Sequence, residues 1–494
     1  MRVLTAKGGE FSISDELRDM LAYLEDGRLV VSKTHFHNPH VRGFIGRLRH
    51  MGQNFTVQQA DLSVVASFYQ NGETSKDRSN MQITAKLLFE RAAELRASDI
   101  HIRVSTKAPT EIWFRINSDL EFIEEHPFEW GDQLCTTIYQ AMTDVSDATF
   151  EKMSRQDARI SSQSYLPSNL DGIRIGTTPQ VDGYVAVLRL LYNDNIDDVD
   201  LGRLGFDPQQ IEAFEIVKKR PTGVIILGGP TGSGKSTTLQ RTLSAIIQEC
   251  GGKKHIITVE DPPEYQIRGA VQTPVANAST EEERSSEYQK AIKAALRLDP
   301  DVIMVSEVRD HPTARLAIQA AMTGHQVWTT LHANGAVAII DRLMDLGVPQ
   351  MLLTDMSIVA GLVCQRLVKQ VCPHCKRPLA DHIHELDPRD ADRFARVLDF
   401  QTVFLSGTGC AHCRGSGTLG RTVVAETVVT DERLMAYLRA NDRVAALDYI
   451  RRGLGVMSML EHAIRKVNAG LVDPFEAESV VGMLSTPVAD LVEV

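Results

Sequence analysis

Between residues 206 and 370, short apolar runs alternate with segments of helical periodicity. The apolar runs predict strands at residues 223–229, 255–261, 301–308 and 326–332. Apolar residues at helical spacing predict helices at residues 234–250, 286–299 and 312–324. Apolar strands that are separated by helices predict a parallel sheet covered on both faces, so we expect an α/β domain at 206–370.

The preceding part of the chain has a different pattern. Residues 80–97 place apolar side chains at helical spacing, and residues 98–104 and 110–117 alternate as half-buried strands do. Residues 171–191 predict two more strands around a glycine-containing turn. We therefore expect a compact α+β domain at 81–195. An acidic, turn-rich linker is expected to follow it at 196–205.

The remaining segments are less regular. Residues 1–80 contain helical-looking pieces without a motif and are treated as an N-terminal domain with an unknown partner. The spacing of His35, His37 and His40 would suit a metal ion, but no acid or cysteine cluster is nearby, so a solvated turn is favoured. Residues 371–430 contain paired cysteines, and residues 431–494 are predicted to form a helical C-terminal domain.

Composition and charge narrow the functional class. At 494 residues the chain is long enough for about three domains. Its 43% hydrophobic and 24% charged residues are those of a soluble globular protein. The formal charge of −11 and the lack of a long Lys/Arg run disfavour a nucleic-acid binder.

No window of the sequence predicts a membrane span or a signal peptide. The N-terminus lacks an apolar core, and the most apolar stretch, residues 351–363, is short and interrupted by Asp355. We expect a cytoplasmic protein, for which any contact with a membrane would be peripheral.

A phosphate-binding motif connects the first predicted strand and helix of the α/β domain. The residues that fit G-x-x-x-x-G-K-[ST] are Gly229, Pro230, Thr231, Gly232, Ser233, Gly234, Lys235 and Ser236, and Thr237 follows them. Glycines allow backbone N–H groups to surround phosphate oxygens, and the helix N-terminus adds positive charge. Lys235 offers a point charge to the β and γ phosphates, and Ser236 a hydroxyl to Mg²⁺.

Hydrolysis of a bound nucleotide also requires a carboxylate and a metal ion. Glu307, at the end of the predicted strand 301–308, is our candidate to activate water; the alternative is an exposed strand-end glutamate. Glu260, Asp261 and Glu264 follow another strand and are candidate ligands of Mg²⁺-bound water, or simply an acidic turn. His325 and His332 flank the predicted strand 326–332 and are either site residues or core histidines bonded to the backbone.

Seven cysteines form two sets. Cys135, Cys250 and Cys364 stand alone and are expected to be small buried residues. The other four form two C-x-x-C pairs: Cys372, Cys375, Cys410 and Cys413. Four thiolates at about 2.3 Å suit a structural zinc ion, so we expect Zn²⁺ at these pairs. A redox pair is the alternative, and His374 and His412 inside the pairs are not expected to be ligands.

Taken together, the motifs resemble those of the secretion ATPase superfamily, most closely the type II secretion and type IV pilus assembly ATPases (GspE/PilB type). The segments that carry the resemblance are GPTGSGKSTTL, TVEDPPEY, LDPDVIMVSEVRD, AAMTGHQVWTTLHAN, ASDIHIRV, QRLVKQVCPHC and GCAHCRGSGTLGRTVVAE. It covers residues 80–480. The sequence departs from the family's usual pattern at Ser306, at residues 311–314 and at Ala333.

The resemblance implies a RecA-like P-loop ATPase domain preceded by a PAS-like α+β domain, with a zinc-knuckle insertion at 371–430. It implies a homohexamer that binds ATP and Mg²⁺, in which His325 and His332 belong to the nucleotide site. It also implies that Arg174 and Arg189 of the preceding domain reach the phosphates, where a guanidinium would neutralise developing charge. The alternative interpretation is that both arginines are ordinary surface residues of their strands, without a role in nucleotide binding.

The implied function is a hexameric ATPase motor. It would power assembly of type IV pili or of a type II secretion pseudopilus through an inner-membrane platform protein and the pilin or pseudopilin machinery. Alternatives are a pilus retraction or conjugation-type secretion ATPase, both disfavoured by the cysteine pairs. A nucleic-acid-stimulated motor or a zinc-knuckle binding module is an alternative of another class, disfavoured by the acidic charge.

Overall fold

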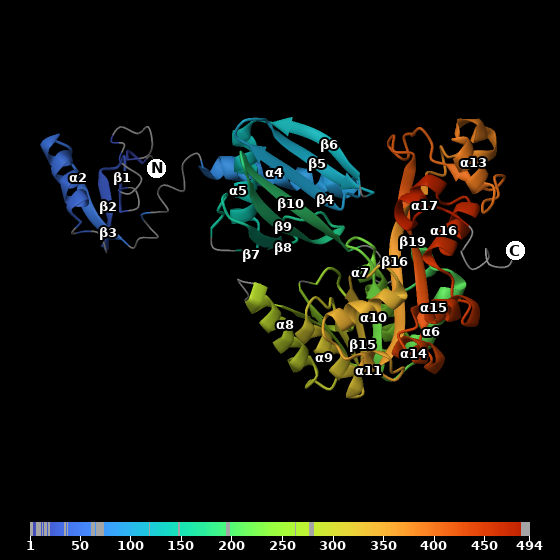
Figure 1. Cartoon of the computed structure of the whole chain (residues 1–494). Coiled ribbons are helices and arrows are strands. Elements are labelled where there is room, and N and C mark those ends of the chain that lie inside the picture. The colour runs from blue at the N-terminus through green and yellow to red at the C-terminus, as the bar shows by residue number, and fades with distance from the viewer. Residues whose placement is uncertain are drawn as a thin grey trace. The chain divides into compact units, whose positions relative to one another are not determined.

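The computed structural model shows a chain that divides into two compact units (Figure 1). The first unit comprises residues 1–116, 120–168 and 172–190, and the second comprises the rest. The structure describes residues 3–5, 11, 13, 17, 20–33, 36, 38–60, 65, 74–117, 119–146, 149–193, 198–261, 263–275 and 281–485. Among these residues no helix is both long and apolar enough to cross a membrane.

The described N-terminal part of the first unit contains a small three-stranded sheet and helix α2. Strands β1 (Leu21–Tyr23) and β2 (Arg28–Ser32) are antiparallel, and β3 (Thr56–Ala60) pairs with β2 in parallel. Helix α2 (Pro39–His50) connects β2 to β3 and packs Val41, Phe44 and Leu48 into a core with the first two strands. His40 is exposed in the first helical turn rather than in a loop, and His35 and His37 lie outside the described residues.

A seven-stranded sheet forms the rest of the first unit, in the order β6-β5-β4-β10-β9-β8-β7. Its strands are β4 (Asp99–Ser105), β5 (Thr110–Ile116), β6 (Asp119–His126), β7 (Val145–Ser146), β8 (Gln156–Ile160), β9 (Leu170–Gln180) and β10 (Gly183–Tyr192). Two helices accompany them, α4 (Thr74–Glu94) and α5 (Phe128–Ala141). The neighbours β4–β5, β4–β10 and β8–β9 are antiparallel, so this part is α+β as expected.

The second unit is built on a sheet with the order β13-β12-β14-β15-β11-β16-β19. The strands are β11 (Gly223–Gly228), β12 (Ile256–Glu260), β13 (Val271–Pro274), β14 (Val302–Val305), β15 (Gln326–Leu331), β16 (Val359–Val371) and β19 (Thr418–Val429). All pairs are parallel except β16–β19, which is antiparallel. The parallel sheet predicted from the apolar runs is therefore present.

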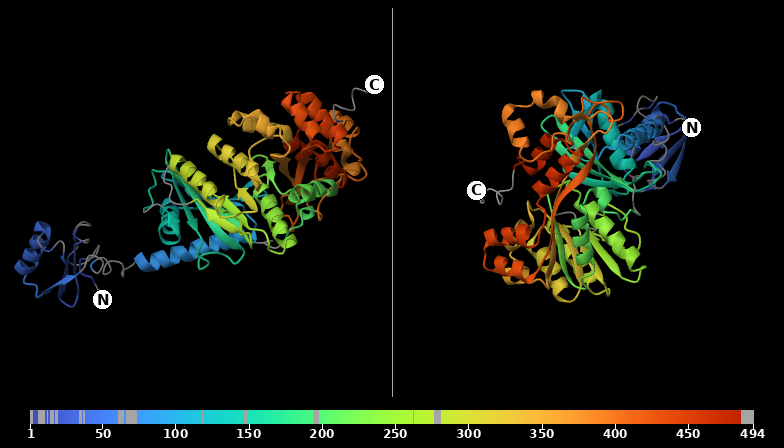
Figure 2. Two further views of the ribbon diagram at one scale, coloured as in Figure 1. Left: turned by 90° about the horizontal axis from the view of Figure 1, so that it is seen from below. Right: turned by 90° about the vertical axis from the view of Figure 1, so that its right-hand side faces the viewer.

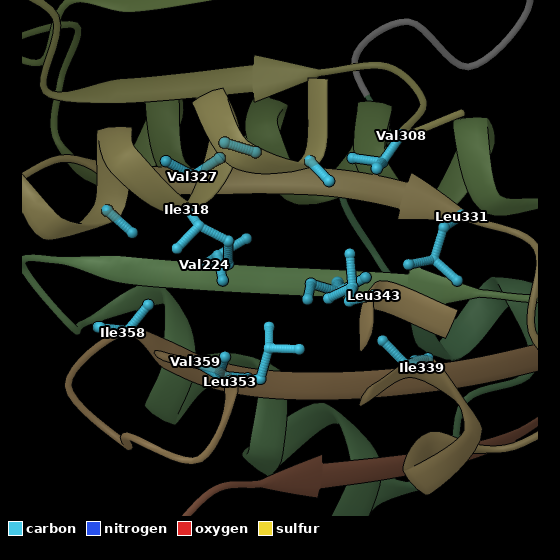
Figure 3. Close-up of a cluster of buried hydrophobic side chains, with 14 of the residues drawn as sticks. Val224, Val308, Ile318, Val327, Leu331, Ile339, Leu343, Leu353, Ile358 and Val359 are labelled. Carbon is cyan, nitrogen blue, oxygen red and sulfur yellow. The ribbon is translucent and has the colours of Figure 1, made fainter. Parts of the chain in front are cut away.

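Helices cover both faces of this sheet. They are α6 (Pro208–Lys218), α7 (Lys235–Glu249), α8 (Glu281–Ala295), α9 (His311–Met322), α10 (Ala336–Asp345) and α11 (Gln350–Leu353). Alternate residues of β11 point to opposite faces: Val224 and Ile226 join the core under α8–α10, whereas Ile225 and Leu227 join the core under α6 and α7. Figure 3 shows the first of these cores, with Val224 between Val327 and Val359 of the flanking strands.

Strands β16 and β19 extend beyond the sheet as a long antiparallel pair, which the right view of Figure 2 shows. The chain between them forms a small excursion, residues 372–417. It contains β17 (Arg377–Pro378), α12 (Leu379–His382), α13 (Pro388–Phe394) and β18 (Phe404–Leu405). The C-terminal helices follow β19: α14 (Glu432–Arg439), α15 (Arg443–Asp448), α16 (Met459–Asn468) and α17 (Pro474–Val481).

The excursion and the C-terminal helices share one core. Phe394 and Leu405 of the excursion are buried with Val424 of β19 and with Ala463 and Val467 of α16. The excursion is thus packed against the end of the chain instead of standing alone.

Candidate nucleotide-binding site

The phosphate loop connects β11 to α7 at the carboxyl edge of the sheet. Strand β11 ends at Gly228, and helix α7 begins at Lys235. Gly229, Gly232 and Gly234 have φ angles of 152°, 76° and 85°, which residues with side chains rarely adopt. A loop of this kind directs backbone N–H groups at an anion, and the amino end of α7 adds a partial positive charge.

The Lys235 ammonium group is folded back onto this loop. Its Nζ donates to the carbonyl oxygens of Gly229 at 2.7 Å and Pro230 at 3.0 Å. Burial lowers the pKa of Lys235, and the negative charge of Glu307 opposes that shift. Phosphate oxygens would replace two neutral acceptors with anionic ones, so the lysine is placed to bind a polyphosphate.

Glu307 lies beside the phosphate loop, two residues after β14. Its carboxylate accepts a hydrogen bond from Nε of Arg309 at 2.6 Å and lies 2.8 Å from Nε2 of His332. The other ring nitrogen of His332, Nδ1, is 3.2 Å from the Gly229 carbonyl oxygen. His332 therefore connects Glu307 to the phosphate loop.

Glu260 lies at the end of β12, on the same edge of the sheet. Its Oε1 accepts hydrogen bonds from Thr258 Oγ1 at 2.6 Å and from Gln272 Nε2 at 2.9 Å. Burial raises the pKa of Glu260, although these two donors oppose the shift. The carboxylate is thus fixed in place and largely removed from solvent.

Asp261 and Glu264 complete the acidic group. Asp261 lies 3.9 Å from Arg309, which also binds Glu307, so one guanidinium links the two carboxylates. The negative charge of Glu264 opposes the lowered pKa of Lys235 and adds to the raised pKa of Glu260. Carboxylate and hydroxyl oxygens, such as those of Asp261, Glu264 and Ser236, are donors of the kind that Mg²⁺ and its water ligands take.

His325 does not join this group within the chain. It precedes β15, whereas His332 follows it, so the two histidines are at opposite ends of one strand. Nδ1 of His325 lies 3.1 Å from the Ala320 carbonyl oxygen and 3.2 Å from Thr323 Oγ1, at the end of α9. A six-residue strand spans about 20 Å, so His325 is far from the phosphate loop of its own chain.

Arg174 and Arg189 belong to the first unit. Arg174 lies on β9 opposite Arg159 of β8. Arg189 lies on β10, half exposed, and its Nε donates to Asp99 Oδ1 at 3.0 Å. Their contact with phosphates remains a prediction for the assembled protein.

The four paired cysteines meet in one cluster. The Sγ atoms of Cys372 and Cys410 are 3.8 Å apart, and those of Cys375 and Cys413 are 3.7 Å apart. All four Sγ atoms lie within 4.8 Å of one another. Four sulfurs at 2.3 Å from a tetrahedral centre are separated by about 3.8 Å, so the cluster has the dimensions of a zinc site.

Two glycines allow the cysteine loops to approach this closely. A Cβ atom on Gly407 would lie 2.0 Å from the Cys375 carbonyl oxygen, and one on Gly417 (φ 72°) 2.2 Å from the Gly407 carbonyl oxygen. Backbone N–H groups of Cys410 and Gly417 donate to Cys413 Sγ at 3.1 and 3.3 Å. Such donors favour a thiolate, which is the form that binds metal.

The histidines of the C-x-x-C loops and the single cysteines are outside this cluster. The rings of His374 and His412 stack with centroids 3.8 Å apart. Among the described residues, the four cysteines form the group whose ligand atoms lie close enough together to hold a metal ion, and that they bind zinc stays a prediction. Of the single cysteines, Cys135 and Cys364 are buried, whereas Cys250 is partly exposed.

Comparison with known proteins places these features in a family. The family described as "Type II/IV secretion system protein" matches residues 74–480, most of the chain. The chain belongs to this family. The type II secretion system protein E of Klebsiella pneumoniae is 32% identical over 85% of this chain and 78% of its own length. The type II secretion system ATPase E of Vibrio cholerae is 33% identical over 81% and 75%. This secretion ATPase therefore hydrolyses ATP.

A pilus protein and a solved structure are also similar to this secretion ATPase. The type IV pilus assembly ATPase PilB of Thermus thermophilus is 32% identical over 87% of the chain, which spans 46% of that protein. The crystal structure of the pilus retraction motor PilT with bound ADP superposes with a TM-score of 0.54 at 24% identity, covering 83% of this chain and 99% of that one. This structural likeness confirms the α/β fold of a secretion ATPase; the PAS-like description of the first unit stays a prediction.

Several residues at the site of this secretion ATPase were not anticipated from its sequence. Arg309 donates a hydrogen bond to the Glu307 carboxylate. Its position two residues after the glutamate at the end of the strand is the sequence feature that could have indicated this contact. Tyr288 Oη accepts from the Glu307 backbone N–H at 3.3 Å and lies 3.0 Å from Ser306 Oγ. Ser306, which stands where the family usually has glycine, thus bonds to the tyrosine that supports Glu307. Nothing in the sequence pattern of α8 marks Tyr288.

Proposed function

We propose that this secretion ATPase is the motor of a homohexameric ring that drives assembly of a type IV pilus or a type II secretion pseudopilus. The observation that supports this most directly is the contact chain from Glu307 through His332 to Gly229 of the phosphate loop. It gathers a carboxylate, an imidazole ring and the lysine of the loop at one edge of the sheet, which are groups that ATP hydrolysis uses.

The geometry suggests a role for each side chain. Lys235 binds the β and γ phosphates, and Glu307 orients the attacking water and accepts its proton as the bond from γ-phosphorus to the bridging oxygen breaks. His332, in contact with Glu307 and the loop, responds to the presence of the γ-phosphate. Ser236, Asp261 and Glu264 would hold Mg²⁺ and its waters, and the ion would neutralise charge on the phosphates.

Mechanical work would follow from a difference between ATP and ADP states. In the ring, Arg174 and Arg189 of the first unit would reach the γ-phosphate. Loss of the γ-phosphate on hydrolysis would remove this contact and so release the first unit from the second. The released motion would act on a polytopic inner-membrane platform protein that adds pilin-like subunits to a fibre. The protein would thus stay in the cytoplasm and meet the membrane through this partner.

The cysteine cluster favours assembly over retraction. Its sulfur separations fit one structural Zn²⁺ per chain, and this element is typical of secretion and pilus assembly ATPases. The bound ion would join the two ends of the excursion at 372–417 and so fix a surface for a partner.

The test of the catalytic assignment is Glu307→Gln in the assembled full-length protein. The amide keeps the size of the side chain but cannot accept the proton of water, so we expect ATP turnover to fall by about 10²–10⁴-fold while ATP still binds. Glu432→Gln, an exposed glutamate in the first turn of α14, is the matched control and should keep parental turnover. Parental turnover in Glu307→Gln would contradict the assignment.

A further inference from the structure

Three consecutive residues in the middle of β16 contact both loops of the nucleotide site. Gln365 donates from Nε2 to the Ser233 carbonyl oxygen of the phosphate loop at 2.8 Å. On either side of it, Cys364 Sγ lies 3.6 Å from the Ala333 carbonyl oxygen, and Arg366 donates to Asn334 Oδ1 at 3.3 Å. Alternate strand residues face opposite sides, so one side of β16 holds the phosphate loop and the other the loop after His332.

The phosphate loop is shaped closely around Gln365. A Cβ atom on Gly229 would lie 2.4 Å from the Gln365 carbonyl oxygen, and one on Gly234 would lie 3.3 Å from its Nε2. These are two of the loop glycines with positive φ. The backbone at residue 365 and its side chain therefore limit the positions that the loop can take.

Two polar atoms of the Gln365–Ser233 pair are left without partners. Gln365 is fully buried and Ser233 is 3% exposed, yet Gln365 Oε1 and Ser233 Oγ have no hydrogen-bond partner among the residues that the structure describes. Buried polar atoms without partners destabilise the conformation that contains them. The conformation of the phosphate loop in this structure therefore costs free energy at the Gln365–Ser233 contact, and a change of that contact on phosphate binding would recover it.

We propose that Gln365 is a positioning residue for the nucleotide, which holds the phosphate loop from the sheet side and couples its closure to phosphate binding. This role rests on the proposed function, because the ligand is the nucleotide of that site. Gln365 touches the loop through the Ser233 peptide and does not reach the reacting atoms itself. The same strand ends at Val371, directly before Cys372, so the loop is held by the strand that leads into the cysteine cluster.

The experiment compares Gln365→Met with the parental full-length protein. Methionine keeps the length of the side chain but removes both amide atoms. We expect Kd for a fluorescent ATP analogue, and KM for ATP, to rise about tenfold, the usual effect of one buried hydrogen bond. The value of kcat at saturating ATP should stay within about threefold, because Glu307 and His332 are unchanged. The rise in Tm that ATP produces should shrink in parallel.

Gln326→Met is the matched control. Gln326 is equally buried on β15 but lies at the opposite edge of the sheet, where its Nε2 donates to the carbonyl oxygens of Val217, Lys218 and Arg220. This variant should lower Tm without nucleotide and leave Kd unchanged.

The outcomes separate this proposal from the proposed function. Unchanged Kd and KM in Gln365→Met would overturn the positioning role. A lower Tm with no change in Kd would also overturn it, because a residue that only stabilises the fold gives that result. A parental protein that fails to bind the analogue would overturn the nucleotide site itself. A tenfold Kd change in Gln365→Met, absent from Gln326→Met, supports the proposal.

Discussion

Replacing Cys372 and Cys410 by serine tests the cysteine cluster most directly. These residues contribute one sulfur from each C-x-x-C pair, 3.8 Å apart, so the double variant leaves too few thiolates for a structural zinc site. We expect the parental protein to contain about one zinc ion per chain and the variant almost none.

The size of the effect follows from the chain that the ion closes. Between Cys375 and Cys410 lie 34 residues. Treated as a covalent cross-link, closure of a loop of this length stabilises the folded excursion by about 4 kcal/mol. Loss of the ion should therefore raise the population of the opened excursion by roughly a thousandfold.

Limited proteolysis and metal analysis together measure this change. Trypsin cleaves after basic residues, and Arg389 and Arg396 are exposed within the excursion. If the excursion opens and closes faster than trypsin cleaves it, the cleavage rate at these two arginines follows the opened population. That rate should then rise by up to the same factor in the variant. Cys250→Ser, outside the cluster, should keep both zinc and the parental cleavage rate.

Two results would refute the reasoning. A parental protein purified without zinc would reject the metal site. A zinc-free variant cleaved at the parental rate would show that the shared core with α16 and α17, not the metal, holds the excursion in place.

Two further predictions concern other parts of the chain. Arg189→Ala should abolish most ATP turnover in the assembled ring. Arg115 also lies near Asp99, with its Nε 3.9 Å from that carboxylate, but Arg115→Ala should keep ATP turnover. Equal loss of turnover in both variants would indicate that Arg189 acts only by binding Asp99. Burial lowers the pKa of His462 to about 4, below the value of about 6.5 in an unfolded chain, so stability is lost as pH falls from 6.5 towards 4. Urea unfolding should show about 2 kcal/mol less stability at pH 5 than at pH 7.5, a difference that His462→Gln should lack.

The core of the second unit was predictable because its strands are buried on both faces. Strands such as β11 and β15 are therefore continuous apolar runs, which the sequence alone identifies as strands without knowledge of their neighbours in the sheet. Strand β6 has no buried residue and mixes acidic with apolar side chains, so it gave no such signal. Strands β16 and β19 mix polar and apolar residues, and the excursion separates them in the chain, so their pairing depends on contacts that no local pattern encodes.

In the candidate site, too, some features could be predicted from a local sequence pattern and others required the three-dimensional structure. The phosphate loop and Glu307 follow from a local motif and from the end of a strand. The contact between Glu307 and His332 joins two strands, so it required the sheet order β14-β15-β11. The separation of His325 from His332 follows from the strand between them, because only its carboxyl end reaches the loop. Gln365 lacked any signal, since a single glutamine in a strand has no distinctive spacing.

The antiparallel pairing of β16 and β19 makes the cysteine-bearing segment between them, residues 372–417, a replaceable insertion. Val371 and Thr418 are register partners, so the points where the segment leaves and rejoins the sheet are adjacent. Paired residues of this kind lie about 5 Å apart, a gap that a two-residue hairpin turn closes. Evolution or an engineer can therefore shorten, replace or transplant the segment between related motors while the strands beneath the nucleotide keep their register.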